Sequence, residues 1–168
     1  VAGNDNPAAW AATTDPNIYA QAYARRFTNV LINPLDPNAL GGLGGIYRPD
    51  GGAGTQYTIW ASQGQQQILG IPGVNTTVWG YHNNESGPTF PGRTFETRQG
   101  TPITVRWGNN LRDASGPLPH LFPVDQTITI QTPTTGVPLA VHHHGGDTGA
   151  PFDGTPDQWA TPARQQIG

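Results

Sequence analysis

The stretch RTFETRQGTPITVRW, residues 93–107, indicates the fold class of this chain. A Gln-Gly pair at positions 99–100 separates two runs in which apolar and polar side chains alternate, and such a pair is a two-residue hairpin signal. In the second run, Ile103, Val105 and Trp107 fall on one face of a strand, and polar side chains alternate with them on the other. The stretch therefore predicts a β-hairpin with one face turned towards a core.

Further short segments outside this stretch carry the same strand pattern. They comprise residues 55–61, 76–79, 126–130 and 138–144. In the first of them, Tyr57, Ile59 and Ala61 share one face. Short strands of this kind, separated by turn residues, predict an all-β sandwich or barrel with antiparallel pairing.

The composition agrees with an all-β fold and excludes several other classes. The 168 residues include 23 glycines and 17 prolines, but charged residues make up only 11%, so disorder driven by charge is excluded. The length allows one domain. The net charge is −3, without a basic stripe, and no apolar run reaches the roughly 18 residues of a membrane span. We therefore expect neither nucleic acid nor a membrane as a partner.

Cysteine and methionine are both absent from the chain. It has no cysteine, which excludes a disulfide, a thiolate nucleophile and a zinc finger. It also has no methionine, and its first residue is Val1, so we expect a processed product, with a removed secretion signal as one explanation. The expected location is therefore extracellular or in the cell envelope.

Residues 1–45 differ in pattern from the rest and predict an N-terminal arm. Asp15 and Pro16 fit the N-cap and the first position of a short helix. Pairs of glycines just before Ile46 predict a flexible join. We expect the arm to pack along a main domain that spans residues 46–168.

Three consecutive histidines, His142, His143 and His144, end an apolar segment directly before two glycines. In a strand, His142 and His144 share one face with Cα atoms roughly 6.6 Å apart, and His143 takes the other face. Two imidazoles at that spacing can reach one metal, or two metals side by side. Imidazole suits copper, zinc and iron alike. A surface histidine run without a ligand role is the alternative, and the spacing leaves both open.

Other chemical sites find little support in the sequence. His82 and His120 have no partner at ligand spacing, so we expect them to be structural or surface residues. The carboxylates are scattered singly, which leaves no candidate pair for a glycosidase. The sequence contains no nucleophile elbow, phosphate-binding loop or dinucleotide fingerprint.

The histidine run resembles a known copper motif when its neighbours are considered. HHHGG at 142–146, followed by DGTP at 153–156 and by Trp159, resembles the first copper-binding motif of the multicopper oxidases. Further segments resemble the same family in the same order, namely WGY at 79–81, PGRTFE at 91–96, VRWGNNL at 105–111 and HLFPVD at 120–125. Arg93 stands where the family has a second proline. The resemblance covers roughly residues 27–168 and is nearest to the spore-coat laccases and bilirubin oxidases.

The resemblance implies a cupredoxin-like Greek-key β-sandwich or barrel and a laccase-like activity, in which phenolic-type substrates are oxidised and dioxygen is reduced to water. It implies that His142 binds the type 2 copper and His144 a type 3 copper of a trinuclear centre, whereas His143 is not a ligand. Asp153 matches an acidic residue near the solvent path to that centre, which implies a role in proton delivery. A turn-forming role before Gly154 is the alternative, and both stay open.

The family's other copper ligands imply a partner. A type 1 copper needs a cysteine thiolate, and the trinuclear centre needs further His-x-His motifs, but this chain has no cysteine and only one such motif. We therefore expect the N-terminal piece of an oxidase divided by proteolysis or between two genes. In this interpretation a second polypeptide completes the sandwich and supplies the remaining ligands. Two alternatives are a non-catalytic β-sandwich that carries copper and a structural module.

Overall fold

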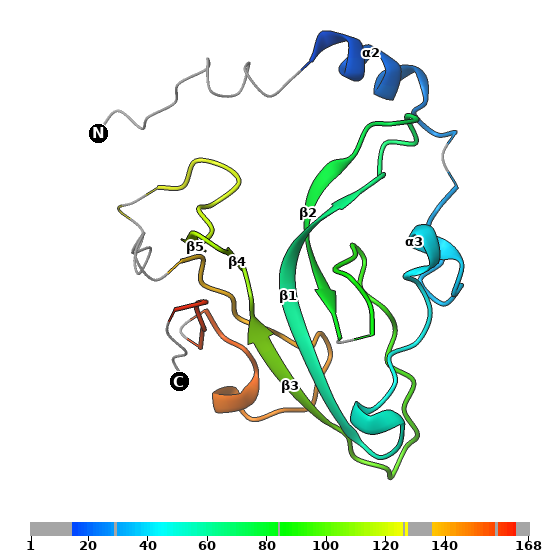
Figure 1. The fold of residues 1–168 in the computed structure, drawn as a ribbon. Helices are drawn as coiled ribbons and strands as arrows, with labels where there is room; N and C mark the ends of the chain where they lie inside the picture. Colours follow the sequence, from blue (N-terminus) through cyan, green and yellow to red (C-terminus); the bar gives the residue numbers. More distant parts are fainter. Residues whose placement is uncertain are drawn as a thin grey trace.

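The computed structural model describes residues 15–28, 30–83, 85–125, 127, 136–156 and 158–163 (Figure 1). In chain order its elements are α2 (Pro16–Ala24), α3 (Ala39–Gly42), η1 (Asp50–Gly52), β1 (Gln56–Gln66), β2 (Thr76–His82), β3 (Thr104–Asn109), β4 (Arg112–Asp113), β5 (Gly116–Pro117) and η2 (Ala150–Phe152). The described part is mostly β with short helices, which confirms the predicted class. Within it, no helix has the length and hydropathy of a membrane span. The predicted strand at 126–130 lies outside the described residues, apart from Thr127.

The centre of the fold is a three-stranded sheet in which β1 lies between β2 and β3 (Figure 1). β1 and β2 are antiparallel, whereas β1 and β3 are parallel, with Gln56 opposite Thr104. β4 and β5 form a separate two-stranded ribbon. Both sheets are open, as expected for part of a cupredoxin-like sandwich. The expectation of antiparallel pairing throughout is wrong, because β3 reaches β1 through a long connection and not through a hairpin.

The hairpin predicted at residues 93–107 does not form. The turn itself is present, since the Thr101 N–H donates to the Arg98 main-chain oxygen at 3.0 Å. Gly100 has a φ of +81°, but Gln99 keeps a negative φ, so the turn lacks the mirror-image geometry that tight hairpins need. Residues 93–98 therefore separate from β3 and make a single bridge, between Ile46 and Thr94.

The core lies on the face of β1 that the sequence predicts. Tyr57, Ile59 and Ala61 are all buried, and Ile59 has no exposed surface. Ile103 and Val105 of the predicted inward face pack against this cluster. The predicted alternation is therefore confirmed on β1 and for Ile103 and Val105, although the two strands pair in an unexpected direction. It is wrong for Trp107, which is 36% exposed.

The N-terminal helix α2 begins as predicted but packs little. The Asn17 N–H donates to the Asp15 side chain at 2.8 Å, with proline at the first helical position. α2 buries none of its residues and lies beyond one end of the sheet (Figure 1). The residues that follow it do contact the sheet region, where Arg93 Nε donates to the Leu43 main-chain oxygen at 2.9 Å. The arm is therefore held by its second half.

Candidate metal-binding site

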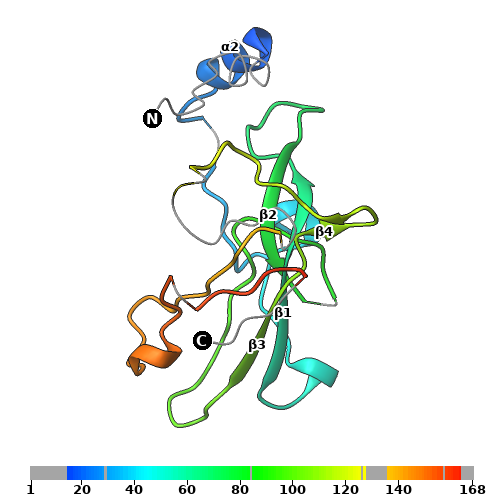
Figure 2. The same cartoon turned by 90° about the vertical axis from the view of Figure 1, so that its left-hand side faces the viewer.

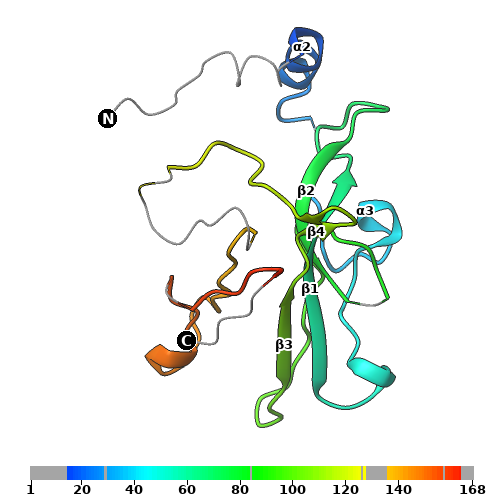
Figure 3. The ribbon, with the colours of Figure 1, turned by 60° about the vertical axis from the view of Figure 1, so that its left-hand side comes forward.

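The described part of residues 136–163 carries the histidine run and lies to one side of the three-stranded sheet (Figures 2 and 3). Asn109, the last residue of β3, holds this part in place. Its side-chain nitrogen donates to the main-chain oxygens of Val137 and Ala160, both at 2.8 Å. Leu139 and Ala160 then exchange two main-chain hydrogen bonds of 2.9 and 3.0 Å. The end of β3 therefore anchors the segments before and after the histidines.

Sequence reasoning missed the role of Asn109, although a signal was present. Asn109 continues the inward face of Ile103 and Val105, and a polar residue on an inward face needs hydrogen-bond partners. It is only 8% exposed, and its side-chain oxygen accepts from the Leu111 N–H at 3.1 Å. Its partners at Val137 and Ala160 are distant in sequence, so the signal alone did not identify them.

The prediction of a strand at residues 138–144 is wrong beyond Leu139. Leu139 forms one bridge with Ala160, and no ladder continues from it among the described residues. A strand needs a neighbour along its length, whereas here the chain turns after the histidines, with the Gly146 N–H donating to the His143 oxygen at 3.0 Å. The histidine run therefore leads into a turn at the surface.

The rings of His142 and His144 nevertheless lie together, as the alternation predicts. Their centroids are 5.1 Å apart, with an angle of 71° between the ring planes. All three histidines of the run are exposed. The structure thus presents two imidazoles side by side at the surface, and the ligand role of each stays a prediction.

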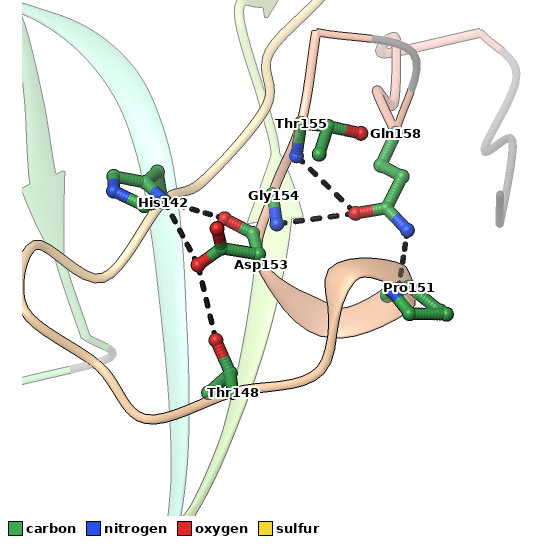
Figure 4. Close-up of polar contacts among 7 residues, drawn as sticks. All are labelled: His142, Thr148, Pro151, Asp153, Gly154, Thr155 and Gln158. Atoms are coloured by element: carbon green, nitrogen blue, oxygen red, sulfur yellow. Dashed lines mark hydrogen bonds and ion pairs between the residues drawn. The ribbon is translucent and has the colours of Figure 1, made fainter.

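Asp153 lies directly against His142 (Figure 4). His142 Nδ1 is 2.5 Å from the Asp153 main-chain oxygen and 3.2 Å from its carboxylate oxygen Oδ1. Thr148 Oγ1 donates to the same Oδ1 at 3.0 Å. Asp153 also ends η2 and precedes Gly154, which has a φ of +68°. The residue therefore combines a turn position with contact to the histidine, and both readings of its role remain compatible with this geometry.

His82 lies within a hydrogen-bonded cluster. Its Nε2 is 2.9 Å from Ser62 Oγ, and its Nδ1 is 2.9 Å from the Asn83 main-chain oxygen. Both ring nitrogens are therefore engaged by residues around the end of β2, as expected of a structural histidine. The ring of His120 lies 6.5 Å from the ring of Trp79.

The donor set fits part of a metal site. His142 and His144 offer two adjacent imidazoles, a ligand type that suits copper. Among the residues that the structure describes, no group of three or more histidine, cysteine, aspartate or glutamate side chains is placed to hold a metal ion. The pair therefore fits copper as two ligands of a larger set, not as a complete site.

No protein family model matches the chain. No solved structure matches it. Several curated proteins do match it over roughly half of its length or more. The multicopper oxidase LPR1 of Arabidopsis thaliana is 38% identical over 94 residues, which is 55% of this chain and 15% of that protein. A laccase of Bacillus subtilis is 35% identical over 96 residues, or 55% of this chain and 17% of the laccase.

A laccase of Haloferax volcanii matches a longer part of the chain. It is 32% identical over 130 residues, which is 70% of this chain and 20% of that laccase. The chain thus spans 15–20% of the length of these three relatives. The names of the relatives agree with the resemblance that the motifs indicate.

Proposed function

Since this chain is a sequence relative of multicopper oxidases and laccases, we propose that it forms part of a copper oxidoreductase. The proposed enzyme oxidises a phenolic-type substrate one electron at a time and reduces dioxygen to water. The observation that carries the proposal is the pair His142 and His144, whose ring centroids are 5.1 Å apart. The pair lies in the segment that resembles the family's first copper motif.

In the proposed enzyme, His142 binds the type 2 copper and His144 one type 3 copper of a trinuclear centre. Bound copper would supply reversible one-electron chemistry at this site. Both imidazoles are exposed, which supports this role. A metal bound to either ring can also be reached by ligands from another segment. The protein's own contribution is to hold the two rings at a fixed spacing.

Asp153 has a proposed role in moving protons. Its side chain is 36% exposed, so water reaches it, and its Oδ1 lies 3.2 Å from His142 Nδ1. A carboxylate between solvent and a metal ligand is placed to deliver protons towards the reduction of dioxygen. The contact with Thr148 holds Oδ1 in that position.

The proposed copper centre needs more ligands than the described residues bring together. The chain lacks cysteine, and the structure describes no third ligand beside the histidine pair. We therefore propose a second polypeptide that supplies a cysteine thiolate and further histidines, in a secreted assembly. Intact-mass analysis of the native preparation tests this point, because it separates a lone chain from a complex with a cysteine-containing partner.

The function is tested by single substitutions in the assembled protein. His142→Ala and His144→Ala should each abolish oxygen uptake and lower the copper content measured by elemental analysis. His143→Ala is the matched control and should change neither. Unchanged oxygen uptake in both ligand variants would refute the proposal. Tight, stoichiometric copper on the isolated chain without oxidase activity in the assembly would instead favour a copper carrier.

A further inference from the structure

The hydrogen bond between His142 and Asp153 determines which ring nitrogen of His142 is free for a metal. His142 Nδ1 lies 2.5 Å from a main-chain carbonyl oxygen and 3.2 Å from a carboxylate oxygen, and neither of these groups donates when the carboxylate is ionised. Nδ1 must therefore carry the hydrogen. In a neutral imidazole, Nε2 then holds the lone pair. The ring is thus set to bind a metal through Nε2.

The position of the Asp153 carbonyl depends on the turn that follows it. Gly154 adopts a φ of +68°, and a Cβ at this position would collide with the main-chain oxygen of Val141, the residue before His142. The turn and the histidine segment are therefore in backbone contact. A shift of the turn moves the carbonyl that holds the His142 ring.

The side chain of Gln158 fastens both ends of this turn (Figure 4). Its Oε1 accepts from the Gly154 N–H at 3.1 Å and from the Thr155 N–H at 3.2 Å. Its Nε2 donates to the Pro151 main-chain oxygen. One amide therefore ties the backbone on the two sides of Asp153 together.

We propose that Gln158 is a positioning residue for the metal ligand His142, acting through the turn at residues 151–155. It holds the Asp153 carbonyl against Nδ1, and this contact keeps the hydrogen on Nδ1 and directs Nε2 to the metal. A metal-bound histidine commonly donates its other ring N–H to a carbonyl or carboxylate, so the arrangement suits a ligand. The part of the inference that concerns copper rests on the proposed function, whereas the part that concerns the ring does not.

The first experiment determines which ring nitrogen of His142 carries the hydrogen, in the metal-free full chain. Nitrogen-proton correlation spectra of the imidazoles, recorded where the rings are neutral, should show His142 with its hydrogen on Nδ1. Gln158→Leu removes all three contacts and should convert this signal to a mixture of the two tautomers. Thr148→Val is the matched control, because it loses only the contact with the Asp153 carboxylate and should leave the signal unchanged. An unchanged His142 signal in Gln158→Leu would overturn the inference.

Gln158→Glu is the control for a general folding defect. Glutamate keeps an acceptor for the Gly154 and Thr155 N–H groups but cannot donate to Pro151. We expect it to retain the Nδ1 hydrogen on His142. If Gln158→Glu has native backbone signals and yet loses this tautomer, the assignment of the role to the acceptor contacts is refuted.

Copper titration of the same variants in the assembled protein, followed by electron paramagnetic resonance, supplies the second readout. Gln158→Leu should weaken copper binding about 10- to 100-fold, the range typical of lost partners of a metal ligand, whereas Gln158→Glu should stay close to wild type. His142→Ala separates a failure of the proposed copper function from a failure of the role assigned to Gln158. Equal copper binding by His142→Ala and wild type would refute the proposed function, while the tautomer result would still decide the role of Gln158.

Discussion

The side-chain nitrogen of Asn109 donates a hydrogen bond to the main-chain oxygen of Ala160, 2.8 Å away and 51 positions later in the chain. The same nitrogen reaches the Val137 oxygen, so one buried amide joins the end of β3 to both segments around the histidines. The geometry of the candidate metal site therefore depends on a residue whose side-chain hydrogen bonds go to neither histidine.

Asn109→Leu should lower the free energy of unfolding by about 1–3 kcal/mol, because it leaves the two carbonyls without their donor. Urea unfolding of the full chain measures this change. Asn110→Ala is the control, since Asn110 is exposed and makes a single side-chain bond, to Ser62 at 3.1 Å. Equal effects of the two substitutions would contradict the anchoring role of Asn109.

Gly154→Ala should destabilise the chain, because the position has a φ of +68° and a Cβ would meet the Val141 carbonyl. We expect a loss of about 2 kcal/mol or more in the free energy of unfolding, together with a weaker His142 contact. Gly149→Ala is a matched control, because its φ of −65° suits alanine and its Cβ would make only ordinary contacts at 3.8 and 3.9 Å. Thermal unfolding of both variants checks the prediction, which fails if Gly154→Ala melts like Gly149→Ala.

Thr89→Val should raise the free energy of unfolding by about 1 kcal/mol. Thr89 is only 2% exposed, and its hydroxyl has no hydrogen-bond partner within the described part of the structure. Valine has nearly the same shape and removes the cost of burying an unpaired polar group. Chemical denaturation provides the measurement. Thr77→Val is the control: it loses the hydrogen bond from Gln65 Nε2 to the Thr77 hydroxyl and should not stabilise the chain. A lower free energy of unfolding in Thr89→Val would contradict the prediction, because it would show that the Thr89 hydroxyl is paired.

The stability of the chain should decline in alkaline solution. Burial raises the pKa of Tyr47 and of Tyr81 above the ordinary value. The unfolded chain then loses these phenolic protons first, so the free energy of unfolding falls as the pH rises above about 10. Denaturation at a series of pH values measures the free energy of unfolding, and phenolate absorbance measures the ionisation of the tyrosines. Tyr81→Phe should reduce the pH dependence, whereas Tyr19→Phe, at an exposed position, should leave it as in wild type.

Features that depend on neighbouring residues could be predicted from the sequence. The N-cap at Asp15 and the buried face of Tyr57, Ile59 and Ala61 follow from local geometry and from the two-residue period of a strand. The tight hairpin could not be predicted securely, because the Gln-Gly signal does not fix the φ of Gln99.

Strand and hydrogen-bond partners that are distant in the chain could not be predicted from the sequence. The parallel register of β1 and β3 joins segments that no local pattern relates. In the candidate site, the motif indicated the adjacency of His142 and His144, but the contacts of Gln158 depend on how the turn folds back. Such polar side chains have many possible partners, and only the three-dimensional arrangement selects among them.

The parallel pairing of β1 with β3 has a consequence for the order of events on the ribosome. β1 and β2 can join as soon as both have emerged, but the other edge of β1 has to wait for the residues around Thr104. At the usual pace of translation this wait from Gln56 to Thr104 lasts roughly 2–10 s. During that interval β1 offers unpaired main-chain groups to any nascent neighbour, so the fold exposes the growing chain to intermolecular strand pairing at one defined edge.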